Sequence, residues 1–186
     1  MNKIFIAAAL AVSSGLVSAD DFTDTLENAR QAYEEGDIGA AREELVYATQ
    51  LLGQMRTKKL IGFLPEAIDG WERKDAKDQG GAGLSVMGGG TTATANYKND
   101  KEQIKISIIA DSPMIQGLSM LFSNAALAGS QGTMKRIARQ KVMVKPDGSL
   151  TTLVDKRIMV EVSGRAPAEI KEAYFKLIDF KALAAY

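Results

Sequence analysis

The chain of 186 residues contains no cysteine and no histidine. Without cysteine it has neither a disulfide nor a thiol nucleophile, and without histidine it lacks the side chain that most often acts as general base at neutral pH. Both residue types are also the commonest ligands of zinc, copper and haem iron. These absences exclude much of known enzymology, so we expect a protein without enzymatic activity and without a cofactor.

The chain also lacks an excess of charge of either sign. It carries 23 Lys and Arg against 23 Asp and Glu. A balanced surface creates no field that would gather nucleic acid or anionic lipid. We therefore expect neither nucleic-acid binding nor stable membrane insertion.

Residues 1–19 have the pattern of a cleavable secretory signal peptide. Lys3 precedes the apolar run 4–12, and the small residues Val17-Ser18-Ala19 suit a signal peptidase. The run falls short of the roughly 20 residues that span a bilayer. We expect cleavage after Ala19 and a location in the periplasm of a Gram-negative bacterium. Because the exported chain has no disulfides, its hydrophobic core must stabilise it.

Residues 20–62 are predicted to form an antiparallel helical hairpin. From Phe22 to Ile61 the chain has no proline, and Gly36-Asp37 interrupts an apolar pattern of helical spacing. The apolar residues at helical spacing before the break are Leu26, Ala29, Ala32 and Tyr33, and those expected on one face of the second helix are Ala40, Ala41, Leu45, Ala48, Leu51 and Leu52.

The turn Gly36-Asp37 followed by Ala41, Leu45 and Ala48 resembles the turn and second helix of a tetratricopeptide repeat. In that family small residues let paired helices approach closely, and stacked pairs form a groove for peptides. One unit of about 20 residues is present here, whereas such arrays need about three. The resemblance therefore implies the hairpin and not the groove.

Residues 63–186 are predicted to form an α+β domain with an antiparallel sheet and two packed helices. The clearest strand is 103–110, in which Ile104, Ile106 and Ile108 alternate with other residues. The other expected strands are 84–87, 91–98, 134–138, 141–145, 150–154 and 157–163, with a turn at 146–148. The stretch 72–79 is predicted to be a polar connection.

The first expected helix begins at Pro113 with Ser112 as its cap, presents Met114, Leu118, Leu121, Phe122 and Ala125 on one face, and ends at Gly129. The second runs over 167–178 and buries Ile170, Tyr174, Leu177 and Ile178.

Leu64-Pro65 and Gly70-Trp71 lie at the entry of this domain, and Val162-Ser163-Gly164 lies at the end of a strand before the last helix. Through these residues the domain is similar in pattern to the PsbP/Mog1-like superfamily. That resemblance implies an accessory or lipoprotein domain without catalysis of its own.

Other motifs favour structural interpretations. The glycines at 80–90 are not followed by the Lys-Ser/Thr of a phosphate-binding loop, so a hairpin tip or a flap is expected there. The acidic pairs do not match a calcium loop, and the methionines are too scattered for copper. Lys135, Arg136, Arg139 and Lys141 form a basic cluster on neighbouring strands, interpreted as a protected sheet edge or a patch for an acidic partner.

We therefore hypothesise an accessory protein that binds another periplasmic or envelope protein through its hairpin or through a cleft between sheet and helix 113–128. The alternative is a small-molecule or lipid-binding protein with a pocket near the Gly-rich segment, and a third reading is a hydrolase using two carboxylates. The candidate contact residues are Trp71, Met87, Met114, Leu118, Phe122, Arg136 and Arg139. Trp71 is also expected to anchor the junction between hairpin and sheet.

Overall fold

A computed structural model of the chain describes residues 19–75, 90–124 and 129–186. Residues 1–18 of the predicted signal peptide, the expected strand 84–87, the Gly-rich segment up to residue 89 and Met87 lie outside these residues. Contacts divide the chain after Leu51 into two compact units, called here the hairpin unit, described from Ala19, and the sheet unit, Leu52–Tyr186.

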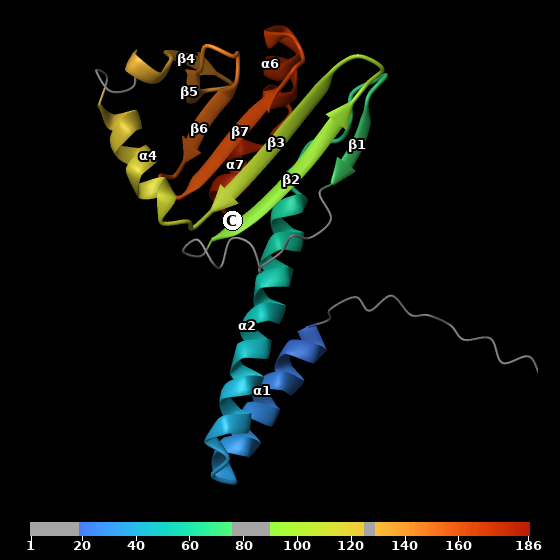
Figure 1. The fold of residues 1–186 in the computed structure, drawn as a ribbon, viewed down its shortest axis with the longest axis vertical. Helices are drawn as coiled ribbons and strands as arrows, with labels where there is room; N and C mark the ends of the chain where they lie inside the picture. Colours follow the sequence, from blue (N-terminus) through green and yellow to red (C-terminus); the bar gives the residue numbers. More distant parts are fainter. Residues whose placement is uncertain (1–18, 76–89, 125–128) are drawn as a thin grey trace, which may run out of the picture. The chain divides into compact units, whose positions relative to one another are not determined.

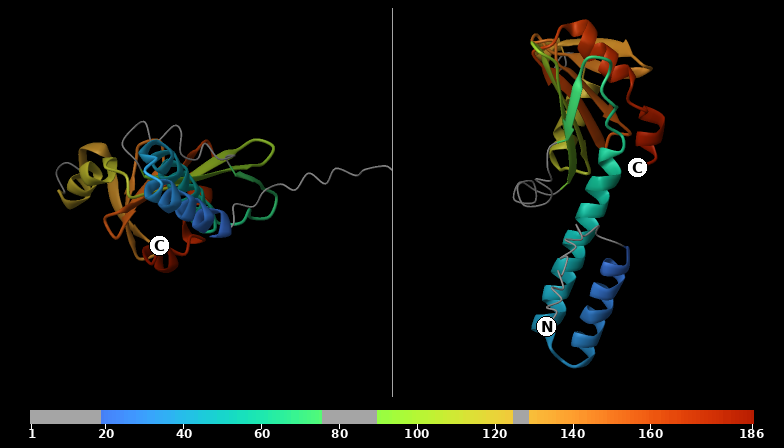
Figure 2. Two further views of the ribbon diagram at one scale, coloured as in Figure 1. Left: turned by 90° about the horizontal axis from the view of Figure 1, so that it is seen from below. Right: turned by 90° about the vertical axis from the view of Figure 1, so that its right-hand side faces the viewer.

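The hairpin unit contains helix α1, Ala19–Glu34, and most of helix α2, Ile38–Ile61, which lie side by side (Figures 1 and 2). The predicted turn is confirmed. Gly36 has a positive φ of 84°, and the amide of Asp37 donates to the carbonyl of Ala32 at 2.9 Å. The Asp37 carboxylate then accepts from the amide of Ala40 at 2.9 Å and so satisfies a free amide of the first turn of α2.

The sheet unit is built on an antiparallel sheet, which confirms the predicted α+β class. Its seven described strands have the spatial order β1-β2-β3-β7-β6-β5-β4, and all neighbours run antiparallel. The strands are β1 Glu72–Asp75, β2 Thr91–Lys98, β3 Gln103–Ala110, β4 Thr133–Ile137, β5 Gln140–Val144, β6 Leu150–Val154 and β7 Ile158–Gly164.

Three helices follow strands of this unit: α4, Met114–Ser123, after β3, and then α6, Ala168–Lys176, and α7, Phe180–Ala184, after β7. Among the described residues, no helix has the length and hydropathy needed to cross a membrane.

One face of the sheet carries the main core. Ile104, Ile106 and Ile108 of β3 are fully buried there, and Tyr174 and Phe175 of α6 belong to the same cluster. Leu60, near the end of α2, is also part of it. In the side view of Figure 2 the C-terminal helices lie on one side of the sheet and α4 lies on the other.

The opposite face has its own contact with α4. Strand alternation directs Lys141 and Met143 away from Val142, which belongs to the main core. The ammonium group of Lys141 donates to the carbonyl of Phe122, in the last turn of α4, at 2.6 Å. This bond ties the end of α4 to the face that α6 leaves free.

Some predicted details are wrong. Residues 72–75 form strand β1 and not a connection, because the polar side chains of this edge strand give no alternating apolar signal. Pro113, not Ser112, is the N-cap residue of α4, and α4 ends at Ser123 instead of Gly129. Leu177 is 52% exposed because α6 ends at Lys176, so its side chain leaves the buried face.

Replacing Gly164 by Ala is expected to destabilise the sheet unit strongly. Gly164 has a φ of 121°, and a Cβ there would lie 2.2 Å from the carbonyl oxygen of Gln103. Strain and overlap together give an expected loss of about 2 to 4 kcal/mol in the free energy of unfolding, measured by urea denaturation.

Gly53→Ala is the control. A Cβ at Gly53 meets no described atom within 4 Å, and the position is helical. It should stabilise the protein by about 0.5 to 1 kcal/mol. Equal effects of the two substitutions would contradict the close approach at Gly164.

Candidate protein-binding surface

The hairpin unit buries small side chains. Thr25 and Ala29 of α1, and Ala41 and Ala48 of α2, are each at most 6% exposed, and Leu51 at the end of the unit is the large residue buried with them. Small residues along the contact line let two helices approach closely, and the large side chains beside that line then remain outside. The backbones, and not interlocked large residues, therefore form most of this contact.

Large apolar residues of the hairpin unit are exposed as a result. They are Leu26, Tyr33, Ile38, Leu45, Val46 and Tyr47. Leu26, Tyr33 and Leu45 belong to the apolar faces identified from the sequence, as does Leu52, yet the structure leaves all four exposed. Helical spacing identified an apolar side of each helix but did not show which part of it meets the other helix.

Four of these residues lie on one flank of the hairpin, called here the Leu45 flank. Leu26 and Tyr33 are seven residues apart on α1, as are Ile38 and Leu45 on α2, and seven residues make almost two full helical turns. On each helix, viewed along its own axis from the N-terminus to the C-terminus, this stripe is rotated by about a quarter turn from the buried line, and the direction of rotation is the same for both helices. Because the helices run antiparallel, the two stripes face the same side.

The rim of the Leu45 flank is charged. On α1, Arg30 donates to Glu27 at 3.0 Å and also pairs with Glu34, and these bonds raise the pKa of the guanidinium. Arg42 has the corresponding outer position on α2. The α1 rim thus has one more acid than base, whereas on α2 the neighbouring Glu43 balances the cation.

Val46 points away from the Leu45 flank. It lies half a turn from the buried line of α2, yet its 51% exposure equals the 52% of Leu45. This side of α2 has a shallow, open groove lined by Gly39, Arg42, Glu43, Val46, Tyr47 and Gln50.

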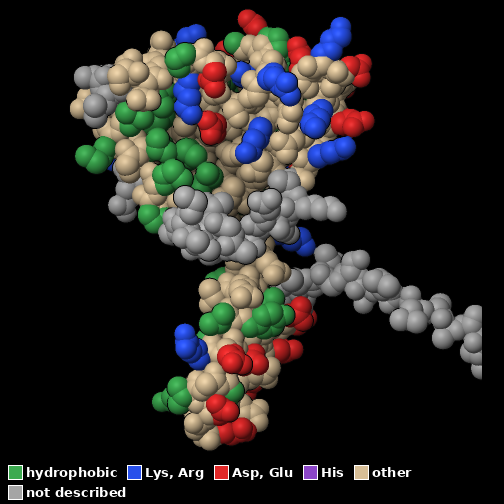
Figure 3. All heavy atoms as spheres, in the orientation of Figure 1, with side chains coloured by type: hydrophobic (Ala, Val, Ile, Leu, Met, Phe, Trp, Pro, Cys, Tyr) green, Lys and Arg blue, Asp and Glu red, His purple; other side chains and the backbone are tan. Residues whose placement is uncertain are grey.

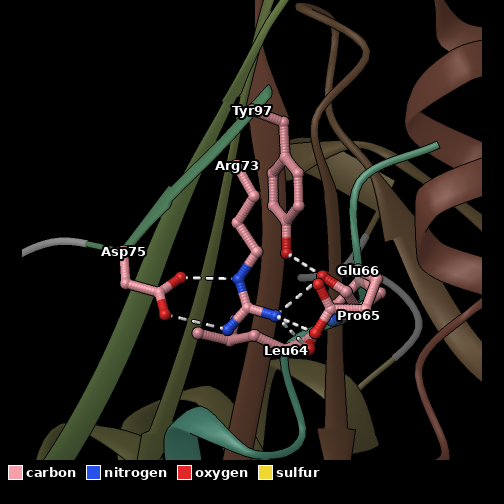
Figure 4. Close-up of polar contacts among 6 residues, drawn as sticks. All are labelled: Leu64, Pro65, Glu66, Arg73, Asp75 and Tyr97. Atoms are coloured by element: carbon pink, nitrogen blue, oxygen red, sulfur yellow. Dashed lines mark hydrogen bonds and ion pairs between the residues drawn. The ribbon is translucent and has the colours of Figure 1, made fainter. Parts of the chain in front are cut away.

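In the sheet unit, Arg73 of β1 clamps the segment that follows α2. Its guanidinium donates to both Asp75 oxygens at 2.6 and 3.0 Å, to the carbonyls of Leu64 and Pro65, and to Glu66 (Figure 4). The hydrogen bond to Asp75 raises the pKa of the Arg73 guanidinium above its ordinary value. These bonds use the donors of Arg73 internally, so the cluster serves the fold.

Tyr97 belongs to the same cluster. Its hydroxyl donates to the Pro65 carbonyl at 2.6 Å, and burial raises the pKa of the phenol. It is fully buried against Tyr174 and therefore has no access to a partner.

Asp111 joins three segments of the sheet unit. It accepts from Arg157 at 2.9 Å and pairs with Arg56 of α2, and its backbone has a positive φ of 56°. The bond from Arg157 lowers the pKa of the Asp111 carboxyl. Its two cations and its position between elements indicate a structural role.

The predicted contact residues do not form one site. Trp71 packs edge-on against Tyr174 with ring centres 5.6 Å apart, as an anchor of the sheet core. On α4, the expected shared face holds Met114, Leu118 and Phe122 at four-residue spacing, but only its end is buried: Met114 is 60% exposed, Leu118 is half-buried and Phe122 is buried. Figure 3 shows hydrophobic side chains over this part of the sheet unit.

The basic candidates lie at the far edge of the sheet. Arg136 is on strand β4, and Arg139 is in the turn before β5 with a φ of 65°. Both are exposed. Arg139 lines an open groove with Asp155, Asp179 and Lys181, whose mixed charges favour no partner of one sign.

Two buried hydroxyls lie on strands β2 and β6. The hydroxyl oxygens of Thr92 and Thr151 have no hydrogen-bond partner among the described residues. Thr152, the next residue, donates instead to the Lys141 carbonyl at 2.8 Å.

Known proteins do not resemble the chain closely enough to assign it. It matches no protein-family model, no curated protein and no solved structure. The resemblances to tetratricopeptide repeats and to the PsbP/Mog1-like superfamily stay predictions, as does the small-molecule alternative. In the described ranges, acidic side chains do not gather in groups of three that could hold a metal ion.

Replacing Asp111 by Asn tests the ion pairs while keeping a residue that tolerates positive φ. Because the folded-state pKa is lowered, the stabilisation is present above about pH 4 and is lost as the pH falls through the folded pKa. We expect Asp111→Asn to cost about 1 kcal/mol at pH 7, a value limited by solvent screening. The difference from wild type should shrink below about pH 4 in urea denaturation; a constant difference down to pH 2 would contradict the ion pairs.

Thr151 and Thr152 form a matched pair, each at most 2% exposed. Thr151→Val removes an unpartnered hydroxyl and should change stability by less than about 0.5 kcal/mol, whereas Thr152→Val removes a bond and should cost about 1 to 2 kcal/mol. Thermal unfolding of both variants provides the measurement. A larger loss for Thr151→Val would mean that its hydroxyl has a partner.

Proposed function

We propose that this protein is a non-enzymatic accessory protein of the bacterial periplasm that binds another protein through the Leu45 flank. The observation that carries the proposal is the exposure of Leu26, Tyr33, Ile38 and Leu45 on one flank of the hairpin. Large apolar side chains gathered on one side of a helix pair are typical of a surface that a partner covers.

The rest of the molecule supports this choice of site. The polar clusters of the sheet unit, at Arg73 and Asp111, are engaged in internal bonds that join its segments. The hairpin unit has a buried line of small residues and therefore holds its shape without using the large ones. A rigid helix pair with unused apolar side chains is suited to binding by contact.

A photo-crosslinking amino acid at position 45 tests the proposal in the protein's own host. Position 46 is the matched control, because the two side chains are about equally exposed and point a little more than a quarter turn apart around α2. We expect position 45 to form a defined protein adduct at least five times more abundantly than position 46.

The outcome is read by mass spectrometry of the adduct. Equal, diffuse crosslinking at both positions would contradict a specific surface on the Leu45 flank. A preference for position 46 would move the binding site to the groove beside Val46.

A further inference from the structure

We infer that the outer edge of strand β4 binds an acidic, extended segment of another protein, which joins the sheet as a further strand. The surface is called here the β4 edge and consists of Met134, Lys135 and Arg136. The inference goes beyond the proposed function, because β4 belongs to the sheet unit and the Leu45 flank to the hairpin unit.

The β4 edge has backbone groups that the sheet does not use. Residues 138–139 form the turn to β5 with φ angles of 47° and 65°, which is the geometry of a type I′ turn. Such a turn makes Ile137 and Gln140, which flank it, a hydrogen-bonded pair. Alternation along an antiparallel pair then directs the N–H and C=O groups of Met134 and Arg136 away from β5. No described residue bonds to these outward groups, through which an extended chain joins a sheet.

The side chains of the β4 edge are cationic and have no acidic partner. Lys135 and Arg136 are exposed, and within the described ranges neither forms an ion pair or a side-chain hydrogen bond. Lys141 of β5 lies directly opposite Arg136, is exposed, and bonds to the uncharged Phe122 carbonyl. Like charges opposite each other on two strands destabilise the pairing, so an acidic side chain beside Arg136 would relieve a repulsion.

The acids around this part of the sheet are already accompanied by cations. Glu161 on β7 pairs with Lys145 at 2.8 Å. Asp155 and Asp179 line the groove at the turn, which also holds two cations, and Lys156 follows Asp155 directly. None of these acids forms an ion pair with the β4 edge, which therefore remains cationic.

The opposite edge of the sheet provides a comparison. Charged residues on an edge strand keep sheets from pairing edge to edge. Strand β1 has two acidic and two basic residues, and its Arg73 bonds to Asp75 and to the segment after α2. Its charges are thus balanced and engaged, whereas those of the β4 edge are of one sign and free. Such an edge repels another copy of β4, which carries the same charges, and attracts an acidic strand.

The pairing geometry defines the occupant. Neighbouring residues of an added strand lie opposite Lys135 and Arg136, on opposite faces of the sheet. Two consecutive acidic residues therefore match the edge, one on the face of each cation. An acidic segment uses both the charges and the outward backbone groups, whereas an anionic membrane surface would use the charges alone.

Fluorescence anisotropy tests the inference with the full protein, purified from an exporting bacterium. The probe is a labelled peptide of alternating Thr and Val with a central Glu-Glu. We expect it to bind about tenfold more tightly than the same peptide with a central Gln-Gln, because two ion pairs are lost. Equal binding of the two peptides, or no binding of the Glu-Glu peptide at about 1 mM, would overturn the inference.

The backbone contribution is tested without changing the protein. Two further Glu-Glu peptides carry N-methyl groups on one or the other set of alternate residues, so that each blocks the donors of one peptide edge. We expect one of them to bind about tenfold more weakly than the unmodified peptide and the other to bind nearly as well. If both bind as well as the unmodified peptide, or if anionic lipid vesicles compete equally, the edge attracts charge only and the inference is wrong.

A pair of variants locates the binding site. Arg136→Gln should weaken peptide binding about three- to tenfold. Lys105→Gln is the matched control, because Lys105 is an exposed cation on the same face but on the central strand β3, and it should change binding less than about twofold. Urea denaturation should show Arg136→Gln to be at least as stable as wild type, since it removes the repulsion with Lys141. Equal weakening by both variants would contradict a site at the β4 edge, and would leave the proposed function of the Leu45 flank unaffected.

Discussion

The sheet unit depends on the antiparallel pairing of β3 with β7 at the centre of the sheet. Ile106 faces Val162 and Ile108 faces Val160 across this pair, and all four side chains are fully buried. Each such side chain, removed from water, contributes about 1.5 to 3 kcal/mol, so this pair of strands makes a large apolar contribution to the unit. Both strands also have neighbours on their other edges, β2 and β6, so every other strand of the sheet is positioned from this pair.

The ends of the same pair place the polar contacts. Asp111 directly follows β3, and its backbone amide donates to the carbonyl of Arg157, which precedes β7, at 3.0 Å. The side chains of these two residues then meet with Arg56 of α2. At the other end, the amides of Arg165 and Ala166 both donate to Gln103, and this turn leads into α6 and the core residues Tyr174 and Phe175. The central ladder therefore determines where α2 and α6 attach.

The hairpin unit follows the opposite rule of packing. The sheet core buries Ile, Val, Phe and Tyr, whereas the hairpin buries mostly Ala and Thr, together with Leu51, and leaves Leu26, Ile38 and Leu45 exposed. Small residues give close backbones but remove little apolar surface from water, so a partner on the Leu45 flank would add the burial that the hairpin lacks. Contact between the two helices and exposure to solvent thus involve different side chains of the same helices, and the sheet unit has the larger core.

Local periodicity was sufficient for much of the secondary structure. The predicted bounds of β2, β3 and β6 match the structure, because alternation of apolar and polar residues reflects a strand with one buried face. The hairpin turn was also predictable, since Gly36 supplies the positive φ and Asp37 the cap. Strand β1 was missed because it is held by interactions with residues that are distant in sequence or outside the strand. Its backbone pairs with β2, and Arg73 donates to the carbonyls of residues 64 and 65, and neither interaction leaves a pattern in residues 72–75 themselves.

The sequence alone determined most of the elements and the class of fold, and it shows that the chain has no cysteine or histidine. Tertiary structure decided which apolar residues are free. Leu45 and Ala48 are three residues apart and belong to the same apolar side of α2. Ala48 is buried against α1 and Leu45 is exposed, because two closely packed helices leave room only for the smaller side chain along the line where they touch. Likewise Thr152 finds an acceptor on β5 and Thr151 finds none among the described residues, because strand pairing, not residue type, decides what each hydroxyl faces.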